Sequence, residues 1–265
     1  MAIALGKAVM KLAPILEKSK PDLILSGFDI AANFAVTVVG AHMNIPVAHI
    51  QGGEVSGNID ESLRHAMSKF SHYHFAANQD AKKRLIKLGE LKSNIFAVGC
   101  PSLDALFSEK NLSRNEVIRK FKIDILKDYI LIIQHPVTTE SKESKKQIIK
   151  ILKALKKINI QKLFVLPNND SGAVNIIKVI KKNKVNFTST LKVQEYKTLL
   201  SNCTMLIGNS SSGIHEAASF FKPVVNIGNR QNGRLKPRNV IDVECNTKEI
   251  LNKINFELKN KKFVK

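Results

Sequence analysis

Cysteine is scarce in this sequence, with only Cys100, Cys203 and Cys245 among 265 residues. Because their number is odd and no C-x-x-C spacing occurs, the pattern argues against a disulfide framework, a zinc site and a redox pair. Cys100 stands between an apolar run and a proline. Free cysteine is usually buried, so we interpret Cys100 as a packing residue and not as a nucleophile.

Long apolar runs are also missing. No stretch approaches the roughly 18 uncharged apolar residues that a membrane-spanning helix requires. The charges in the opening MAIALGKAVMKLAP are too closely spaced for the apolar core of a signal peptide. Hydrophobic residues still make up 44% of the chain, enough for one large or two modest globular domains. We therefore expect a folded cytoplasmic protein without a membrane partner.

Acidic and aromatic residues are few. The chain has 22 acidic against 42 basic residues, a net charge of +20, three tyrosines and no tryptophan. The basic excess is mostly lysine scattered through the expected helices, and few rings are present to stack on bases, so we expect no nucleic-acid partner. A positive field would instead favour an anionic small ligand such as a nucleotide diphosphate.

The sequence does contain a steady alternation of short β-branched runs with amphipathic stretches, which is typical of parallel sheets with crossover helices. Runs such as YILIIQ are apolar throughout, as expected where helices cover both faces of a sheet. A charged segment near Asn111–Asp128 predicts a boundary between domains 1–115 and 116–265, each Rossmann-like, with a cleft between them. The expected strands are 22–26, 46–50, 74–77, 95–98, 129–134, 162–166, 205–207 and 224–227.

Ligands in open parallel sheets bind where strands end and lead into helices. The run IGNSSSGIHEAASF reads as a strand end, a serine turn and a helix start. The turn from Ser210 to Gly213, with Ser210 and Ser211 as the chosen binding residues, would present hydroxyls and backbone N–H groups to a phosphate, although a simple serine N-cap is the alternative. Glu216, one turn later, suits hydrogen bonds from ribose hydroxyls.

A second loop, GNRQNGRLKPR, carries Arg230, Arg234 and Arg238 in a chain that otherwise prefers lysine. Guanidinium groups bind phosphate oxygens in pairs, so one of these arginines is expected to neutralise a diphosphate. A solvated surface loop is the alternative.

Carboxylates follow the strands of the first half. Glu54 and Asp60 share the loop QGGEVSGNID, and Asp29 follows an earlier strand. If the three lie close together, they raise one another's pKa and form a site for acid–base chemistry. For Asp60, capping of the helix that follows is the alternative.

His135 ends the strand YILIIQ and is followed by Pro136, which holds it extended. A histidine facing the cleft at this position could contact a phosphate or move a proton near neutral pH. The alternative is a strand-end histidine bonded to its own neighbours.

These segments together resemble the hydrolysing UDP-N-acetylglucosamine 2-epimerases that supply sialic-acid-type sugars. The matching runs are NIPVAHIQGGEVSGNIDESLRHAMSKFSHYHF, VGCPSLDAL, IIQHPVTTE, LPNNDSG and IGNSSSGIHEAASFFKPVVNIGNRQNGR, in family order across Asn44–Arg234. The resemblance implies two Rossmann-like domains in the glycosyltransferase-B arrangement. It also implies elimination of UDP across C1 and C2 to a glycal, then addition of water to give the free 2-epimer, with no metal or cofactor.

Site roles follow from the same resemblance. Asp29, Asp60 and His135 look like the catalytic residues, for acid–base work or leaving-group handling. The residues that look like UDP-sugar contacts are Gln51, Glu54, Asn168, Ser210, Ser211, Glu216 and Arg230.

The chain also departs from the family pattern. Ile30 stands where the family often has the arginine of a G-D-R run, so either that arginine is replaced or the D-R pair is deleted. Gln51 occupies the place of a catalytic glutamate and is more like the branch that acts on UDP-2,4-diacetamido-2,4,6-trideoxy sugars, toward legionaminic acid. The family begins with βα units that have no counterpart here, so we expect the first domain to be incomplete, with a sheet edge prone to association. Either the sequence is a fragment, or another polypeptide supplies the missing part. We also expect a homo-oligomer.

Four functions stay open on this evidence. They are a hydrolysing 2-epimerase, a glycosyltransferase of the same architecture, a non-hydrolysing 2-epimerase, and an inactive or partial UDP-sugar-binding fragment. Release of free sugar and UDP without an acceptor would select the first.

Overall fold

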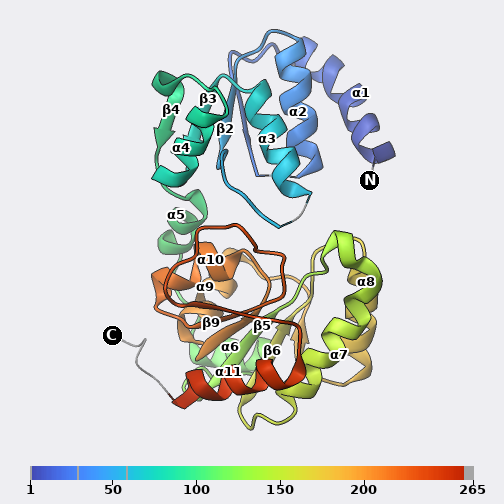
Figure 1. Ribbon diagram of the computed structural model, residues 1–265, viewed down its shortest axis with the longest axis vertical. Helices are drawn as coiled ribbons and strands as arrows, with labels where there is room; N and C mark the ends of the chain where they lie inside the picture. The colour runs from blue at the N-terminus through green and yellow to red at the C-terminus, as the bar shows by residue number, and fades with distance from the viewer. Residues whose placement is uncertain (1, 29, 58, 260–265) are drawn as a thin grey trace. The chain divides into compact units, whose positions relative to one another are not determined.

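The computed structural model describes residues 2–28, 30–57 and 59–259. The chain forms two compact units, Met1–Cys100 and Pro101–Lys265, and each is a parallel α/β unit (Figure 1).

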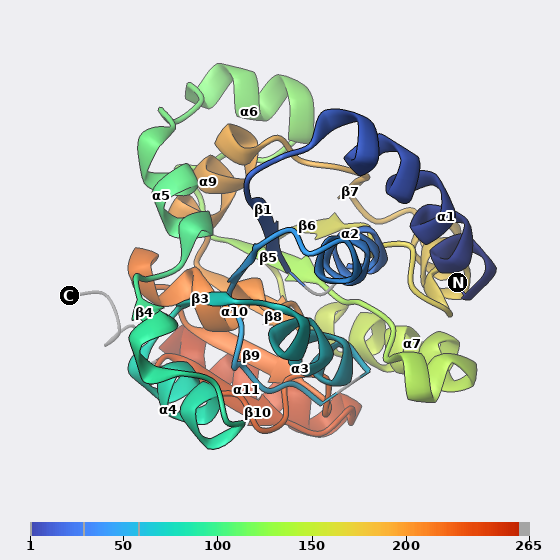
Figure 2. The same cartoon turned by 90° about the horizontal axis from the view of Figure 1, so that it is seen from above.

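The first unit is built on a four-stranded parallel sheet with the order β1-β2-β3-β4. Helices α1 and α2 pack side by side (Figures 1 and 2). Gly40 lets α2 approach the sheet, because a Cβ at this position would lie 2.4 Å from Ile24 Cδ1. The strands are β1 Ile24–Gly27, β2 Val47–Ile50, β3 Tyr73–Ala76 and β4 Ile95–Ala97. The helices are α1 Ala2–Ser19, α2 Ala31–His42, α3 Asp60–Phe70, α4 Gln79–Lys87 and the 3-10 turn η1 Lys92–Asn94.

The second unit has a six-stranded parallel sheet with the order β10-β9-β8-β5-β6-β7. Its strands are β5 Tyr129–Ile133, β6 Gln161–Val165, β7 Phe187–Thr188, β8 Met205–Gly208, β9 Val224–Ile227 and β10 Val240–Val243. Its helices are α5 Pro101–Ser108, α6 Arg114–Phe121, α7 Ser144–Leu155, α8 Ala173–Lys182, α9 Val193–Asn202, α10 Ser212–His215 and α11 Thr247–Lys259, with 3-10 turns η2 Thr138–Glu143 and η3 Ala217–Phe220.

Both faces of the second sheet are covered, as the continuous apolar runs predict. All five residues of β5 are buried. Alternate β5 residues enter two separate cores, with Ile130 and Ile132 in one and Tyr129, Leu131 and Ile133 in the other. Helices α7, α8 and α11 supply the first core, and α6, α9 and η3 supply the second. This double burial fixes the strands whose ends carry the candidate site.

The segment 101–115, which the sequence analysis assigned to the first domain, belongs to the second compact unit. Phe107 on α5 stacks on Phe220 with ring centroids 5.5 Å apart. The Leu112 N–H donates to Thr198 Oγ1 at 2.8 Å, and Lys197 Nζ donates to the Glu109 carbonyl. These contacts attach the segment to α9 and η3.

No helix within the described ranges combines the length and apolarity needed to cross a bilayer.

Candidate functional site

The carboxyl ends of three neighbouring strands, β9, β8 and β5, carry the polar loops that the sequence singled out. Gly208, the last residue of β8, has φ +130°, and a Cβ there would lie 2.0 Å from the Ile133 carbonyl oxygen. Only glycine allows β8 and β5 to run this close before their loops diverge. The turn at Gly208 therefore brings the two loops together.

Asn209 joins these loops and is fully buried. Its Oδ1 accepts from the His135 N–H at 2.7 Å, and its Nδ2 donates to the His135 carbonyl at 2.9 Å. The Asn209 carbonyl accepts from Arg230 Nη1 at 3.3 Å and from Gln231 Nε2 at 2.9 Å. Sequence reasoning gave Asn209 no role, because its partners come from strands that are distant in the chain.

His135 is held as a neutral hydrogen-bond donor. Its Nδ1 accepts from the Asn168 N–H at 3.2 Å, so in the neutral ring the proton lies on Nε2. Burial, with Arg230 as the next cause, lowers the pKa of His135 to about 4, against smaller opposing effects of a hydrogen bond with Asn168 and of Asp170. At neutral pH, His135 is therefore uncharged and its Nε2–H is the donor.

Arg230 supplies the positive charge beside this histidine. Its side chain is 11% exposed, and its nearest carboxylate oxygen, on Asp170, lies 4.0 Å away. Its Nε is buried and has no hydrogen-bond partner among the described residues. A buried guanidinium with an unused donor, next to an imidazole N–H, is suited to bind an anion.

The serine turn follows β8 on the same edge. Ser210 and Ser211 are partly exposed, and Ser212 begins the four-residue helix α10. Ser210 Oγ accepts from the Ser212 N–H at 3.3 Å. Ser212, which the predicted turn included without naming it as a binding residue, has a buried Oγ without a partner among the described residues and is a further donor.

Glu216 follows the last residue of α10 and lines a largely apolar cavity of about 370 Å³. Burial, followed by the nearby charge of Glu216, raises the pKa of Tyr196 well above its ordinary value. Sequence reasoning missed this cavity because the preceding strand, β7, has only two residues. Its other lining residues are Ser102, Ala105, Leu106, Val165, Ser189, Thr190, Leu191 and Val193.

In the first unit, Gln51 and Glu54 follow β2. Gln51 has φ +61°, and its Nε2 contacts Cys100 Sγ at 2.8 Å. The Glu54 carbonyl accepts from Arg64 Nη1 at 2.8 Å. Cys100 is thus partly buried beside a candidate substrate residue.

Asp60 is the first residue of α3 and is partly exposed. Ile59 holds the N-cap position without a side-chain bond, so Asp60 lies in the first turn and does not cap the helix. Asp29, the third predicted catalytic residue, lies outside the described residues.

The two other arginines of the basic loop differ from Arg230. Arg234 Nη1 lies 2.6 Å from His215 Nε2, whereas Arg238 is exposed. Arg230 donates to the carbonyl of Asn209, whose side chain bonds the main chain of His135.

These features define the second unit as a Rossmann-like α/β unit with polar and cationic groups at the carboxyl edge of its sheet. The chain belongs to the UDP-N-acetylglucosamine 2-epimerase family, whose model matches residues 1–265. The resemblance drawn from the sequence motifs is thereby confirmed.

Individual relatives agree with this assignment. A hydrolysing UDP-N,N'-diacetylbacillosamine 2-epimerase of Legionella pneumophila is 40% identical over 95% of this chain and 68% of its own length. A hydrolysing GDP/UDP-N,N'-diacetylbacillosamine 2-epimerase of Campylobacter jejuni is 34% identical, over 87% of this chain and 62% of its own length. The chain thus spans about two thirds of these relatives.

Solved structures show the same fold. The UDP-GlcNAc 2-epimerase of Neisseria meningitidis bound to UDP-GlcNAc has a TM-score of 0.80 at 21% identity, covering 98% of this chain and 74% of that one. The Methanocaldococcus jannaschii UDP-GlcNAc 2-epimerase in complex with UDP-GlcNAc and UDP has a TM-score of 0.81 at 20% identity, covering 96% of this chain and 74% of that one. The predicted class of Rossmann-like parallel α/β units is confirmed.

Proposed function

We propose that this protein is a hydrolysing UDP-sugar 2-epimerase, which converts a UDP-2-acetamido sugar to UDP and the free 2-epimeric sugar. Family membership supports the reaction type. The observation that carries the proposal is the cluster of His135, Asn209 and Arg230 at the carboxyl edge of the second sheet. It combines a cation with a neutral N–H donor at a position where open α/β sheets bind nucleotides.

The nucleotide is assigned along this edge. The diphosphate contacts Arg230, Ser210 and Ser211, and Asn168 orients His135 through its backbone N–H. The uridine enters the apolar cavity beside Glu216, whose carboxylate accepts hydrogen bonds from the ribose hydroxyls. The largely apolar lining of this cavity, which includes the Glu216 carboxylate, supports placing the uridine here.

The reaction then proceeds in two steps. In the first, a base removes the proton from C2, the C1–O bond breaks and UDP leaves with the bonding electrons, giving a glycal. In the second, water adds to C1 and a proton returns to C2 from the opposite side. His135 Nε2–H and Arg230 would stabilise the negative charge that grows on the departing diphosphate.

His135 is assigned to the leaving group because a pKa of about 4 leaves it uncharged at neutral pH and able to donate a hydrogen bond. Asp29 and Asp60 remain the proposed proton carriers. Gln51 and Glu54 are the proposed sugar contacts in the first unit. Gln51 has no ionisable group, so it would hold the sugar without transferring a proton.

Product analysis tests the proposal. The protein is incubated with UDP-GlcNAc and with UDP-2,4-diacetamido-2,4,6-trideoxyglucose, without an acceptor, and the products are read by proton NMR. We expect UDP and a free sugar of manno configuration. A UDP-sugar epimer with an intact nucleotide bond, or turnover that needs an acceptor, would refute it.

The proposal includes a cytoplasmic homo-oligomer. Three free cysteines are in keeping with a reducing compartment. Strand β1 is an edge of its sheet within the described residues, and Leu25 on it is 62% exposed, which favours association. Light scattering coupled to size-exclusion chromatography measures the oligomeric state, and a monomer at micromolar concentration would contradict it.

A further inference from the structure

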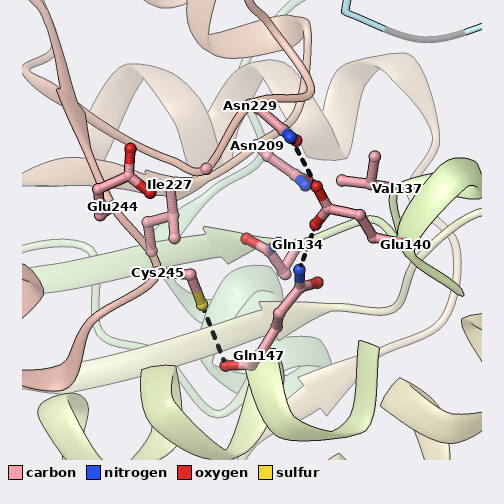
Figure 3. Close-up of a pocket in the computed structure, with 10 residues that line it drawn as sticks. Gln134, Val137, Glu140, Gln147, Asn209, Ile227, Asn229, Glu244 and Cys245 are labelled. Atoms are coloured by element: carbon pink, nitrogen blue, oxygen red, sulfur yellow. Dashed lines mark hydrogen bonds between the residues drawn. The ribbon is translucent and has the colours of Figure 1, made fainter. Parts of the chain in front are cut away.

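A second cavity, of about 170 Å³, opens at the same edge of the second sheet, among the loops after β5, β9 and β10. Figure 3 shows its side chains, with Gln134, Glu140 and Gln147 from the β5 side and Asn229 and Cys245 from the other loops. No lysine or arginine is among the described residues that line it, although the chain carries a net charge of +20. An anionic group is therefore a poor fit, and a neutral polar group is a better one.

The cavity contains an unused acceptor. Gln134 is 5% exposed, and its Nε2 donates weakly to the His135 carbonyl at 3.4 Å. Its Oε1 is buried and has no hydrogen-bond partner among the described residues. Leaving a buried amide oxygen unpaired costs free energy, so this oxygen indicates a missing donor.

Two further lining residues present amide donors that Glu140 orients. Glu140 accepts from Asn229 Nδ2 at 2.6 Å through one carboxylate oxygen and from Gln147 Nε2 at 2.8 Å through the other (Figure 3). Each amide nitrogen carries two hydrogens, and in the described part of the chain each uses one on Glu140. The carboxylate thus fixes two amides that each retain an N–H for a ligand.

The remaining lining combines the acidic residue Glu244 with Gly228 and apolar side chains. Ile227 and Val137 are buried, and Cys245 is held by a contact from its Sγ to the Gln147 carbonyl at 3.8 Å. The cavity therefore offers the unpaired Gln134 acceptor, two amide donors, the acidic residue Glu244 and an apolar surface. A volume of 170 Å³ equals the share of roughly five or six waters in the liquid.

We infer that this cavity, hereafter the amide pocket, binds an acetamido group of the sugar. The acetamido N–H donates to Gln134 Oε1, its carbonyl accepts from Asn229 Nδ2 or Gln147 Nε2, and its methyl group packs on Ile227 and Val137. The inference rests on the proposed function, because it places a UDP-sugar on this edge.

The amide pocket is linked directly at three points to the cluster of His135, Asn209 and Arg230. Gln134 precedes His135, Asn229 precedes Arg230, and Asn209 both lines the pocket and bonds His135. A sugar whose diphosphate lies against His135 and Arg230 can thus direct one substituent into the pocket. Bonds change at C1 and C2 in the proposed reaction, so these carbons must face the leaving-group residues and the proton carriers. We therefore assign the pocket to an acetamido group at C4.

Calorimetric titration with four ligands tests this assignment: UDP, UDP-glucose, UDP-GlcNAc and UDP-2,4-diacetamido-2,4,6-trideoxyglucose. Gln134→Met keeps the length of the side chain and removes the acceptor, so it should weaken binding of the diacetamido ligand about ten- to a hundredfold. Asn229→Ala, at an exposed position, should weaken the same ligand by several-fold. UDP and UDP-GlcNAc should bind as they do to the wild type.

Gln79→Met is the matched control, because Gln79 is an exposed glutamine of the first unit. Similar losses for UDP-GlcNAc and the diacetamido ligand, with UDP-glucose unchanged, would overturn the assignment to C4 and place the C2 acetamido group in the pocket. Unchanged affinity for both acetamido ligands, with normal UDP binding, would overturn the inference and leave the proposed function intact. If Gln134→Met does not fold, the same titrations with Asn229→Ala test the inference. Wild-type protein that binds no UDP would refute both proposals.

Discussion

Replacement of Arg230 gives the sharpest test of the proposed anion-binding edge. Arg230→Met keeps most of the aliphatic stem and removes the guanidinium, whose Nε has no partner among the described residues. The nearest carboxylate oxygen is 4.0 Å away, beyond the roughly 2.7–2.9 Å of a strong charge-assisted bond. Arg230 thus has little ion pairing of its own to lose, so its replacement should weaken ligand binding more than it destabilises the fold.

The expected magnitude follows from one lost charge-assisted hydrogen bond. Such a bond contributes about 1.5–3 kcal/mol, so the dissociation constant for UDP should rise about 10- to 150-fold. Calorimetric titration measures it, and Arg238→Met, at an exposed position of the same loop, is the control. A folded Arg230→Met protein that binds UDP within about threefold of wild type would refute the assignment.

The pH dependence provides a second readout of the same change. Arg230 is one cause of the lowered pKa of His135, which is about 4 in the intact protein. Without Arg230 this pKa rises, so His135 gains a proton at a higher pH and attracts the phosphate. The ratio of variant to wild-type affinity, which cancels titration of the phosphate itself, should therefore improve as the pH falls toward 5. A second substitution, His135→Gln, should abolish that recovery.

Three other changes have defined outcomes. Asp60→Asn should keep UDP affinity but stop release of free sugar in the NMR assay, and normal turnover would remove Asp60 from the mechanism. Burial lowers the pKa of His49 to about 3, so between pH 3 and 6.5 the unfolded chain binds more protons at this residue than the folded protein does. Its contribution to the free energy of unfolding should therefore fall on acidification by up to about 1.4 kcal/mol per pH unit. Urea unfolding at several pH values measures this, and a free energy of unfolding that does not change with pH would contradict it. Gly208→Ala would place a Cβ 2.0 Å from the Ile133 carbonyl oxygen and should lower the free energy of unfolding by about 3 kcal/mol or more. Gly89→Ala is the control, because Gly89 also has a positive φ but no neighbour within 4 Å, and it should cost only about 1 kcal/mol. Equal losses of stability in thermal melts would exclude the contact at Gly208.

Most of the fold could be predicted because buried parallel strands are apolar along their whole length, as in YILII. The two strands that the sequence analysis missed, β7 and β10, are the edges of the second sheet. An edge strand pairs on one side only and needs less apolar sequence. Accordingly, β7 has two residues and β10 contains the exposed Asp242.

The candidate site was predictable only in part. His135 and Arg230 could be selected because their residue types and loop positions suit a phosphate. Asn209 and the acceptor of Gln134 could not, because their importance depends on strand order and burial, which no local pattern encodes. The roles of Asp29 and Asp60 remain predictions.

The side chain of Asn209 has a consequence for the placement of His135. Its amide donates to and accepts from the main chain of His135, so it extends the hydrogen-bond pairing of β5 and β8 by one further pair of bonds. The imidazole therefore keeps its place through rigid sheet pairing. In the proposed function, the group assigned to the phosphate is thus positioned by the sheet and does not depend on the serine turn.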